Sequence, residues 1–279
     1  MKLTAYHRAK SLADARRLLK ELGPTAMPLA GASSHSFVKN DDEKIGVDIA
    51  DIGFEGVECK NGHFVVGANT RIADLQAFHA PGWVLDRVAL RFVSQPLRNM
   101  TTIGGNISRV FPWNDFPVAL LALNATMTIS GEAKTSHLAS VFFDGQPSRL
   151  FQPGDLLTEI SVPEIGEGSG FGYHKESLVN MDFSHLTIAA WIRREGRTSR
   201  DARVAVGAGV PLPCRLSALE AELVGKKCAE ADIAAAVEAH LAGVSWKGDR
   251  GYSSEYIKQL ARAHLPDAIL EACGMAGGR

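Results

Sequence analysis

Two short stretches of small and polar residues are the strongest candidates for chemistry in this sequence. The first is Thr101–Asn106 (TTIGGN), whose adjacent glycines let the backbone adopt conformations closed to other residues and let a ligand come close. Such a loop offers backbone N–H groups to an anion, and phosphate is the obvious candidate. Taken alone, a Gly-Gly pair between a polar and an apolar segment is more often a plain turn.

The second stretch, Gly31–Ser36 (GASSHS), follows the apolar run Met27–Ala30 and is equally rich in small side chains and hydroxyls. Serines favour the N-cap of a helix, so this stretch is either a helix start or a second phosphate-binding loop. Both readings can hold together, because a helix start is also an anion site. Two such loops converging on one ligand would suit a dinucleotide, whose pyrophosphate spans both.

A third candidate is Asp115, which with Asn114 stands just before Pro117 and the apolar helical run Phe116–Leu123. Proline is frequent in the first turn of a helix. Asp115 is therefore either the N-cap of this helix or a polar contact to a ligand in the loop.

Several other kinds of site are excluded by their missing motifs. The sequence has no G-x-G-x-x-G, no Walker phosphate loop and no G-x-S-x-G. Its four cysteines form no C-x-x-C pair, which argues against a zinc site or an iron–sulfur cluster carried by this chain alone. The nine histidines are scattered, and most are expected to be surface or core side chains.

Composition places the chain among ordinary globular proteins. It has 279 residues, 46% of them apolar, and a formal net charge of -1. This length suits two modest domains, and the balanced charge argues against a nucleic-acid partner. No apolar run approaches the ~20 residues that span a bilayer, and the first residues resemble no secretory signal. We therefore expect a cytoplasmic protein without a membrane span.

Local signals in the first half predict a mixture of helices and strands. A helix is expected over Ser11–Leu22, capped by Ser11. Asn61-Gly62 predicts a hairpin. Thr70 is a candidate cap for a short helix, and Leu138–Phe143 is expected to be a strand.

The second half follows a simpler order. Glu164–Gly170 has the composition of a linker, after which strands are expected at Leu186–Ile192 and Arg203–Val210, followed by two or three helices. The last of these helices, over Ser254–Ala272, should be kinked or split by Pro266. A meander followed by helices is a self-contained α+β unit, so we predict a domain boundary near residue 167.

The nine residues Arg98–Asn106 (RNMTTIGGN) match a loop of one family in full, and other matches follow the same order along the chain. The sequence resembles the FAD-binding subunit of the molybdenum hydroxylases, of the xanthine dehydrogenase, carbon monoxide dehydrogenase and aldehyde oxidoreductase types. The further matching positions are the LAGASSHS loop, Val47–Ile49, Gly67–Thr70, Asp115, Pro153–Pro163, Lys175, Asp182 and Gly209–Leu216.

The resemblance implies an α+β chain with a two-subdomain FAD-binding fold (PCMH or vanillyl-alcohol-oxidase type) and a C-terminal α+β domain of a small antiparallel sheet with helices. The expected domains are residues 1–167, with subdomains of about 1–55 and 56–167, and residues 168–279. The two loops would hold the FAD pyrophosphate, Asp115 the sugar–ribityl side, and Lys175 would lie by the flavin ring, with Phe92 as an apolar neighbour. The implied cofactor-binding residues are Leu29, Ala30, Gly31, Ala32, Ser33, Ser34, His35, Phe92, Thr102, Ile103, Gly104, Gly105, Asn106, Asp115 and Lys175.

The resemblance also implies an electron-transfer role without a catalytic residue or a metal on this chain. Electrons from a molybdopterin centre on a large subunit would pass through the [2Fe–2S] clusters of a small subunit to FAD, and then to an acceptor such as NAD. The implied assembly is a dimer of heterotrimers acting on a purine, another N-heterocycle or an aldehyde.

Two departures from the family pattern keep alternatives open. Ala32 replaces the second glycine of the first loop, and Val179-Asn180 stand where the family often has an arginine pair. If Ala32 adopts a positive φ, the strain is roughly 1 kcal/mol. The alternatives are a scaffold subunit with weakened or lost FAD binding, and a stand-alone FAD oxidoreductase.

Overall fold

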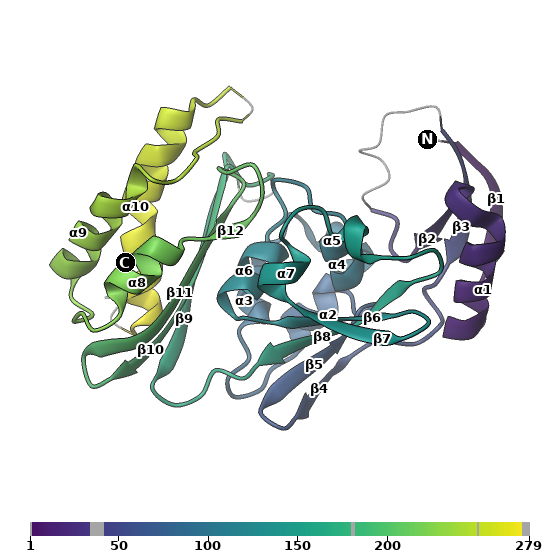
Figure 1. Ribbon diagram of the computed structural model, residues 1–279, viewed down its shortest axis with the longest axis horizontal. Helices are drawn as coiled ribbons and strands as arrows, with labels where there is room; N and C mark the ends of the chain where they lie inside the picture. Colours follow the sequence, from purple (N-terminus) through teal and green to yellow (C-terminus); the bar gives the residue numbers. More distant parts are fainter. Residues whose placement is uncertain (1, 34–41, 180–181, 250, 275–279) are drawn as a thin grey trace.

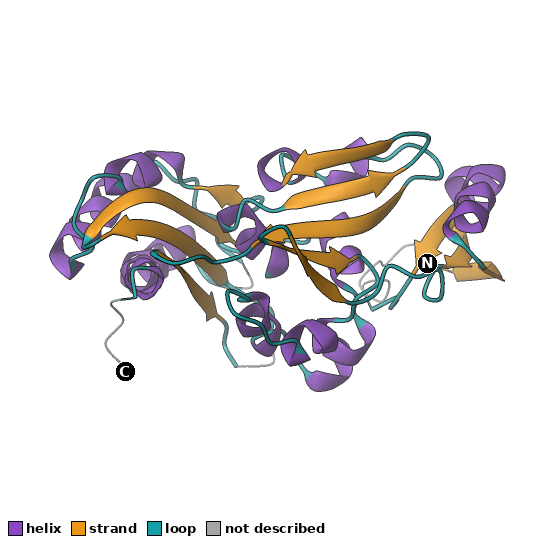
Figure 2. Ribbon diagram, turned by 90° about the horizontal axis from the view of Figure 1, so that it is seen from below, coloured by secondary structure: helices purple, strands orange, loops and turns teal. Residues whose placement is uncertain are grey.

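The computed structural model describes residues 2–33, 42–179, 182–249 and 251–274, and these form three sheets with helices packed on them (Figure 1). The sheets have three, five and four strands, in the orders β1-β3-β2, β4-β5-β8-β6-β7 and β12-β11-β10-β9. Seen from below, they follow one another along the length of the molecule (Figure 2). No helix in the described ranges is long and apolar enough to cross a membrane.

The first sheet is small and parallel. Strands β1 (Lys2–Arg8) and β2 (Ala26–Leu29) both pair in parallel with β3 (Glu43–Asp48). Helix α1 (Leu12–Leu22) connects β1 to β2, and the Ser11 hydroxyl caps it by accepting from the Asp14 N–H at 3.1 Å. The predicted helix over Ser11–Leu22 is therefore confirmed.

The middle part is an antiparallel sheet with short helices on one side. Its strands are β4 (Val57–Lys60), β5 (His63–Gly67), β6 (Thr126–Ser130), β7 (Lys134–Leu138) and β8 (Leu156–Pro163). Its helices are α2 (Ile72–Ala77), α3 (Leu85–Leu90), α4 (Gln95–Met100), α5 (Ile103–Ser108), α6 (Phe116–Ala122) and α7 (Ala139–Phe142). The hairpin at Asn61-Gly62 is confirmed, with φ angles of 52° and 73°.

Two predictions in this part were wrong. The segment Leu138–Phe143 is the end of β7 and then helix α7, because Ala139 and Phe142, three residues apart, both turn into the core. Thr70 is not the cap of α2: Arg71 holds that position, and the Thr70 hydroxyl donates to the Gly56 carbonyl at 3.0 Å instead.

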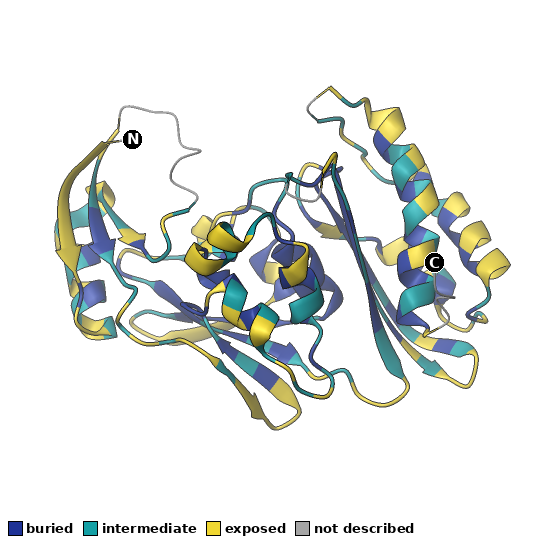
Figure 3. Cartoon of the chain, turned by 180° about the vertical axis from the view of Figure 1, so that it is seen from behind, coloured by how far each residue is buried: buried dark blue, intermediate teal, exposed yellow. Residues whose placement is uncertain are grey.

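The last sheet is an antiparallel meander covered by helices. It contains β9 (Ser169–Glu176), β10 (Leu186–Glu195), β11 (Thr198–Gly207) and β12 (Cys214–Arg215). Helices α8 (Ser217–Leu223), α9 (Glu230–Leu241) and α10 (Ser254–Ala272) follow, with their buried residues toward the sheet (Figure 3). The α+β class expected from the sequence is confirmed.

Helix α10 runs through Pro266 without the predicted break. An internal proline costs a helix about 3 kcal/mol. Leu265 and Ile269, on either side of it, are almost completely buried, and burial of each such side chain contributes about 1.5–3 kcal/mol. Packing on the sheet therefore outweighs the lost hydrogen bond, and the prediction of a split helix was wrong.

Both faces of the four-stranded sheet are covered by other elements. Alternate residues such as Ile188 and Val206 pack under the C-terminal helices, while Phe171, Ala189 and Ala205 face the middle part and share its core. A Cβ at Gly207 would lie 2.5 Å from Val118 of α6. This close packing brings β10 and β11 against α6. The division of the chain near residue 167 remains a prediction, which the change of sheet between β8 and β9 supports.

Candidate functional site

The two candidate loops lie against each other. The Thr101 hydroxyl donates to the Ser33 hydroxyl at 2.8 Å. Gly31 has no room for a side chain, because a Cβ there would overlap the carbonyl of Met100. The predicted Ser34 and His35 lie outside the described residues. The structure thus brings the start of the first loop onto the beginning of the second, although the two are almost 70 positions apart in the chain.

The first loop has a strained backbone and free donors. Ala32 has a φ of 53°, in the left-handed region that costs a residue with a Cβ about 1 kcal/mol. The positive φ considered from the sequence is therefore present. Within the described residues, the N–H groups of Gly31 and Ala32 donate to no protein acceptor. Such a pair of bare amides suits an anionic oxygen.

The second loop differs from the expected row of free amides. The N–H groups of Ile103 and Gly104 donate to the carbonyls of Thr70 and Ala68 at 2.9 and 2.8 Å. The Gly105 N–H donates to the Thr102 hydroxyl oxygen at 3.1 Å, which makes Thr102 the N-cap of α5. These bonds hold the loop rigidly in place, but they occupy most of the donors that the glycine motif would otherwise offer.

Three groups of this loop are left for a ligand. The Thr102 hydroxyl can still donate its own proton. The Asn106 Oδ1 is buried and has no hydrogen-bond partner in the described part of the chain. Gly105 is exposed, so a ligand can approach its Cα closely. A buried amide oxygen without a partner costs free energy, and a donor such as a sugar hydroxyl would satisfy it. These groups fit a dinucleotide with phosphates and hydroxyls.

Arg98 and Asn114 are structural parts of this region that the sequence analysis did not single out. Arg98 donates to the carbonyls of Phe92 and Leu90 at 2.7 and 3.1 Å, which fixes the connection from α3 to α4. The Asn114 amide donates to the carbonyl of Asn106 and so closes the connection from α5 to α6. The sequence signal that could have identified Arg98 was its position at the start of the nine-residue motif Arg98–Asn106.

Phe92 lies at the edge of the core. It is 9% exposed, and its ring centroid is 6.3 Å from that of Phe116 at the start of α6. Because Phe116 directly follows Asp115 in the chain, this contact places Phe92 near Asp115.

Asp115 and Lys175 form a buried ion pair. The Lys175 Nζ lies 2.9 Å from the Asp115 Oδ2, and each side chain is 2% exposed. Lys175 also donates to the Arg91 carbonyl at 3.2 Å, while Asp115 Oδ1 accepts from the Ser184 and Thr187 hydroxyls at 3.3 Å. Every charge in this cluster is paired or hydrogen-bonded, as burial of ions requires.

The sequence left open whether Asp115 caps the helix that begins at Phe116 or uses its side chain for another polar contact, and the structure distinguishes the two. Asp115 holds the N-cap position of α6, but its side chain makes no capping hydrogen bond there. Its carboxylate turns to Lys175 on β9 instead. The neighbouring Tyr173 is partly buried with its hydroxyl oxygen inside, and desolvation, reinforced by the negative charge of Asp115, raises the pKa of this hydroxyl well above the ordinary value. The cluster is therefore one negative and one positive charge, both buried and surrounded by hydroxyl and carbonyl groups.

Two hollows in the structure lie away from these residues. One of about 340 Å³ lies between α8, α9 and the chain around Val210, and one of about 570 Å³ lies beside β7 and Lys20. Neither is lined by any of the candidate residues. Hollow volume alone would therefore not have identified the candidate site.

Comparison with known proteins gives matches over both parts of the chain. Residues 1–165 match the family model described as FAD binding domain in molybdopterin dehydrogenase. Residues 172–272 match that of the CO dehydrogenase flavoprotein C-terminal domain.

Individual relatives agree with these matches. The carbon monoxide dehydrogenase medium chain of Hydrogenophaga pseudoflava is 28% identical over 93% of this chain and 95% of its own length. That of Afipia carboxidovorans is 32% identical over 68% of this chain and 69% of its own length. A solved carbon monoxide dehydrogenase from Hydrogenophaga pseudoflava superposes with a TM-score of 0.92 at 27% identity, covering 99% of both chains.

Proposed function

The chain belongs to the FAD-binding medium subunits of the molybdenum hydroxylases, and we propose that it passes electrons from a [2Fe–2S] partner subunit to an acceptor such as NAD. Its cofactor is FAD, which when bound accepts electrons one or two at a time and so can join an iron–sulfur donor to a two-electron acceptor. The observation that carries the proposal is the contact of the two loops, Thr101 to Ser33, beside unpaired polar groups.

We assign the pyrophosphate to the place where the loops meet. The bare amides of Gly31 and Ala32 and the hydroxyl of Thr102 are the donors that an anionic oxygen requires. The Asn106 Oδ1 is assigned to a sugar hydroxyl, because it is an acceptor without a partner. The remaining predicted loop residues that the structure describes, from Leu29 to Ser33 and from Ile103 to Gly105, would shape the two walls.

We assign the flavin end to the region of Asp115, Lys175 and Phe92. Lys175 brings a positive charge into an almost fully buried place, and a buried cation stabilises negative charge that develops nearby. The Asp115 carboxylate balances the positive charge of Lys175 and orients its ammonium group when no other negative charge is close. The ion pair would thus reduce the free-energy cost of burying the Lys175 ammonium group. The hydroxyls of Ser184 and Thr187 would keep the Asp115 carboxylate in position.

The proposed assembly has a large molybdopterin subunit and a small [2Fe–2S] subunit as partners, in a cytoplasmic dimer of heterotrimers. The names of the matched relatives support an assembly of several subunits, since they describe a medium chain of carbon monoxide dehydrogenase, a subunit of caffeine dehydrogenase and a medium chain of glyceraldehyde dehydrogenase. We propose a purine, another N-heterocycle or an aldehyde as substrate of the whole enzyme, bound on the large subunit.

Two observations favour a second candidate, a scaffold subunit with weakened FAD binding. The amides of Ile103 and Gly104 are occupied by protein carbonyls, and Ala32 carries backbone strain that a glycine would not. Both features would reduce affinity without changing the fold. A titration of the purified chain with FAD separates the two candidates.

The test compares the wild-type chain with Thr102→Val and, as a matched control, Thr135→Val on the exposed strand β7. We expect the wild-type chain to bind one FAD, with flavin absorbance and a higher melting temperature. Loss of a hydrogen bond to a charged group costs about 1.5–3 kcal/mol, so Thr102→Val should weaken FAD binding at least tenfold while Thr135→Val leaves it unchanged. A wild-type chain that binds no FAD would support the scaffold, and equal affinity of both variants would refute the role of Thr102.

A further inference from the structure

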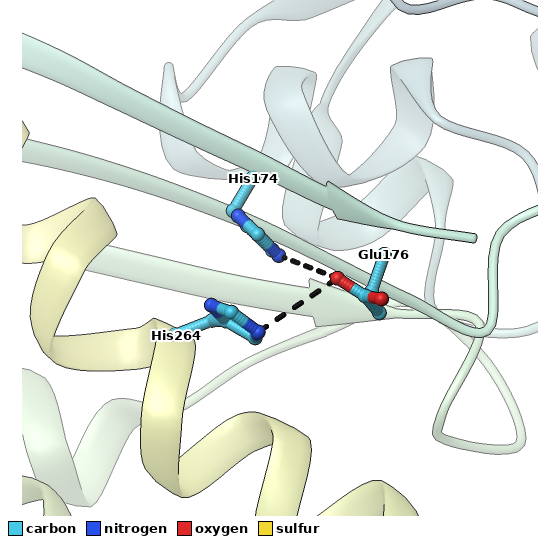
Figure 4. Close-up of side chains that lie close together, drawn as sticks. All are labelled: His174, Glu176 and His264. Atoms are coloured by element: carbon cyan, nitrogen blue, oxygen red, sulfur yellow. Dashed lines mark hydrogen bonds and ion pairs between the residues drawn. The ribbon is translucent and has the colours of Figure 1, made fainter. Parts of the chain in front are cut away.

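Two histidines and a glutamate meet where strand β9 packs against helix α10 (Figure 4). His174 and Glu176 are two residues apart on β9, so their side chains leave the same face of the sheet. His264 comes from the middle of α10. Each residue offers one ligand atom, and these atoms lie within 4.8 Å of one another. The sequence analysis, which expected no metal on this chain, missed this cluster, although the His-x-Glu pair on a strand was a local signal.

The distances in the cluster are those of a metal site before the ion is added. The Glu176 Oε2 lies 3.2 Å from the His174 Nε2 and 3.7 Å from the His264 Nε2. In a tetrahedral zinc site, bonds of about 2.0–2.2 Å place neighbouring ligand atoms roughly 3.4 Å apart. The two observed distances lie on either side of this value. Because an imidazole binds a metal in the plane of its ring, the two stacked rings would also have to rotate until both planes meet at the ion.

The two rings already present the same nitrogen to the carboxylate. Their centroids are 3.9 Å apart and their planes differ by 14°, and both Nε2 atoms approach the Glu176 carboxylate (Figure 4). The free Nδ1 of His264 lies 3.9 Å from the Asp267 carboxylate. This separation is too long for a hydrogen bond, so the Asp267 carboxylate would have to move closer to orient His264 as the carboxylates behind metal-binding histidines do.

The cluster is open to ions from solvent. The side chains of His174, His264 and Glu176 are 26%, 27% and 34% exposed. This leaves a fourth coordination position for water, while the backbone of β9 and α10 holds the three ligands in place. Magnesium and calcium prefer ligand sets made of oxygen, whereas imidazole nitrogens suit zinc and its neighbours.

We propose that His174, Glu176 and His264 bind one divalent transition-metal ion of the zinc class, which joins β9 to α10. The ion is structural in this position, because it adds a link between two elements that already meet through packing and through the hydrogen bond from the Tyr173 N–H to Glu271. Lys175 lies between the two strand ligands but on the opposite face, toward Asp115. The ion would therefore also hold the strand segment that carries the buried lysine. This inference does not depend on the proposed electron transfer.

The test uses the full FAD-loaded chain with any affinity tag removed. Cys59 and Cys214 are exposed thiols that bind zinc on their own account, so both are first replaced by serine. Zn²⁺ is titrated by calorimetry, and Co²⁺ binding is followed by its visible absorption. We expect one ion per chain, nitrogen–oxygen coordination in the cobalt spectrum, and a higher melting temperature with Zn²⁺.

The variants are Glu176→Gln and His264→Gln, with His63→Gln on strand β5 as a matched exposed histidine. Loss of a direct ligand should weaken Zn²⁺ binding by at least about tenfold, while His63→Gln leaves it unchanged. Thermal unfolding without metal shows whether each variant is folded. If His264→Gln does not fold, the Zn²⁺ affinity of the isosteric variant Glu176→Gln tests the proposal. The proposal is overturned if the parent chain shows no saturable Zn²⁺ binding, or if Glu176→Gln leaves the affinity unchanged.

Discussion

Replacement of Lys175 by methionine should destabilise this protein far more than an ordinary surface lysine substitution. Methionine keeps most of the volume of the side chain but removes the charge. Asp115 would then remain buried, with the Ser184 and Thr187 hydroxyls still donating hydrogen bonds to its carboxylate. The loss of stability should be large because both side chains are buried, each being 2% exposed.

The size of the effect follows from the cost of an uncompensated buried charge. Removing one partner of a buried ion pair costs about 3–5 kcal/mol. For a chain of this size each kcal/mol lowers the melting temperature by roughly 2–4 °C, so Lys175→Met should lower it by roughly 6–20 °C. Because two hydroxyls still hold Asp115, we expect the lower half of this range.

A double-mutant cycle with one surface control makes the assay specific. Urea unfolding is measured for Lys175→Met, Asp115→Leu and the double variant, with Lys134→Met as the surface control. Lys134 lies 3.3 Å from Glu159 but is 61% exposed, and such pairs contribute about 0–1 kcal/mol. The double variant should recover most of the stability, because an apolar pair replaces a buried ion pair at little cost. The reasoning is refuted if Lys175→Met costs no more than Lys134→Met, or if the double variant is as unstable as the sum of the single changes.

Three further substitutions test the loops and the last helix. Gly31→Ala should push the loops apart, because its Cβ overlaps the Met100 carbonyl; FAD titration should show more than tenfold weaker binding, whereas Gly166→Ala, which meets nothing within 4 Å, should have no effect. Ala32→Gly should relieve about 1 kcal/mol of strain at a φ of 53°, partly offset by the entropy of glycine, so the melting temperature should stay equal or rise; a fall would show that the alanine is not strained. Pro266→Ala should stabilise α10 by about 2 kcal/mol in urea unfolding, and a loss of stability would contradict the account of this helix.

Local features of the sequence were enough to predict most of the elements and the main ligand loop. The cap at Ser11 and the Asn61-Gly62 hairpin depend on neighbouring residues only, and both appear in the structure as predicted. The TTIGGN motif is likewise a local pattern, and the family model that matches this part of the chain agrees with the expected cofactor. The strand predicted at Leu138–Phe143 failed because burial of Ala139 and Phe142 on one helical face outweighed β propensity.

The tertiary structure decided which groups of the site are free and which are paired. The amides of Ile103 and Gly104 are occupied because the fold brings the carbonyls of Thr70 and Ala68 to them. Asp115 pairs with Lys175, 60 positions along the chain, because α6 packs on β10 and β11 of the sheet to which β9 belongs. His264 reaches His174 because α10 covers the outer face of the same strand. Side-chain spacing along the chain defines which chemistry is present, but hydrogen-bond saturation and charge pairing depend on contacts between distant elements, which only the packed structure contains.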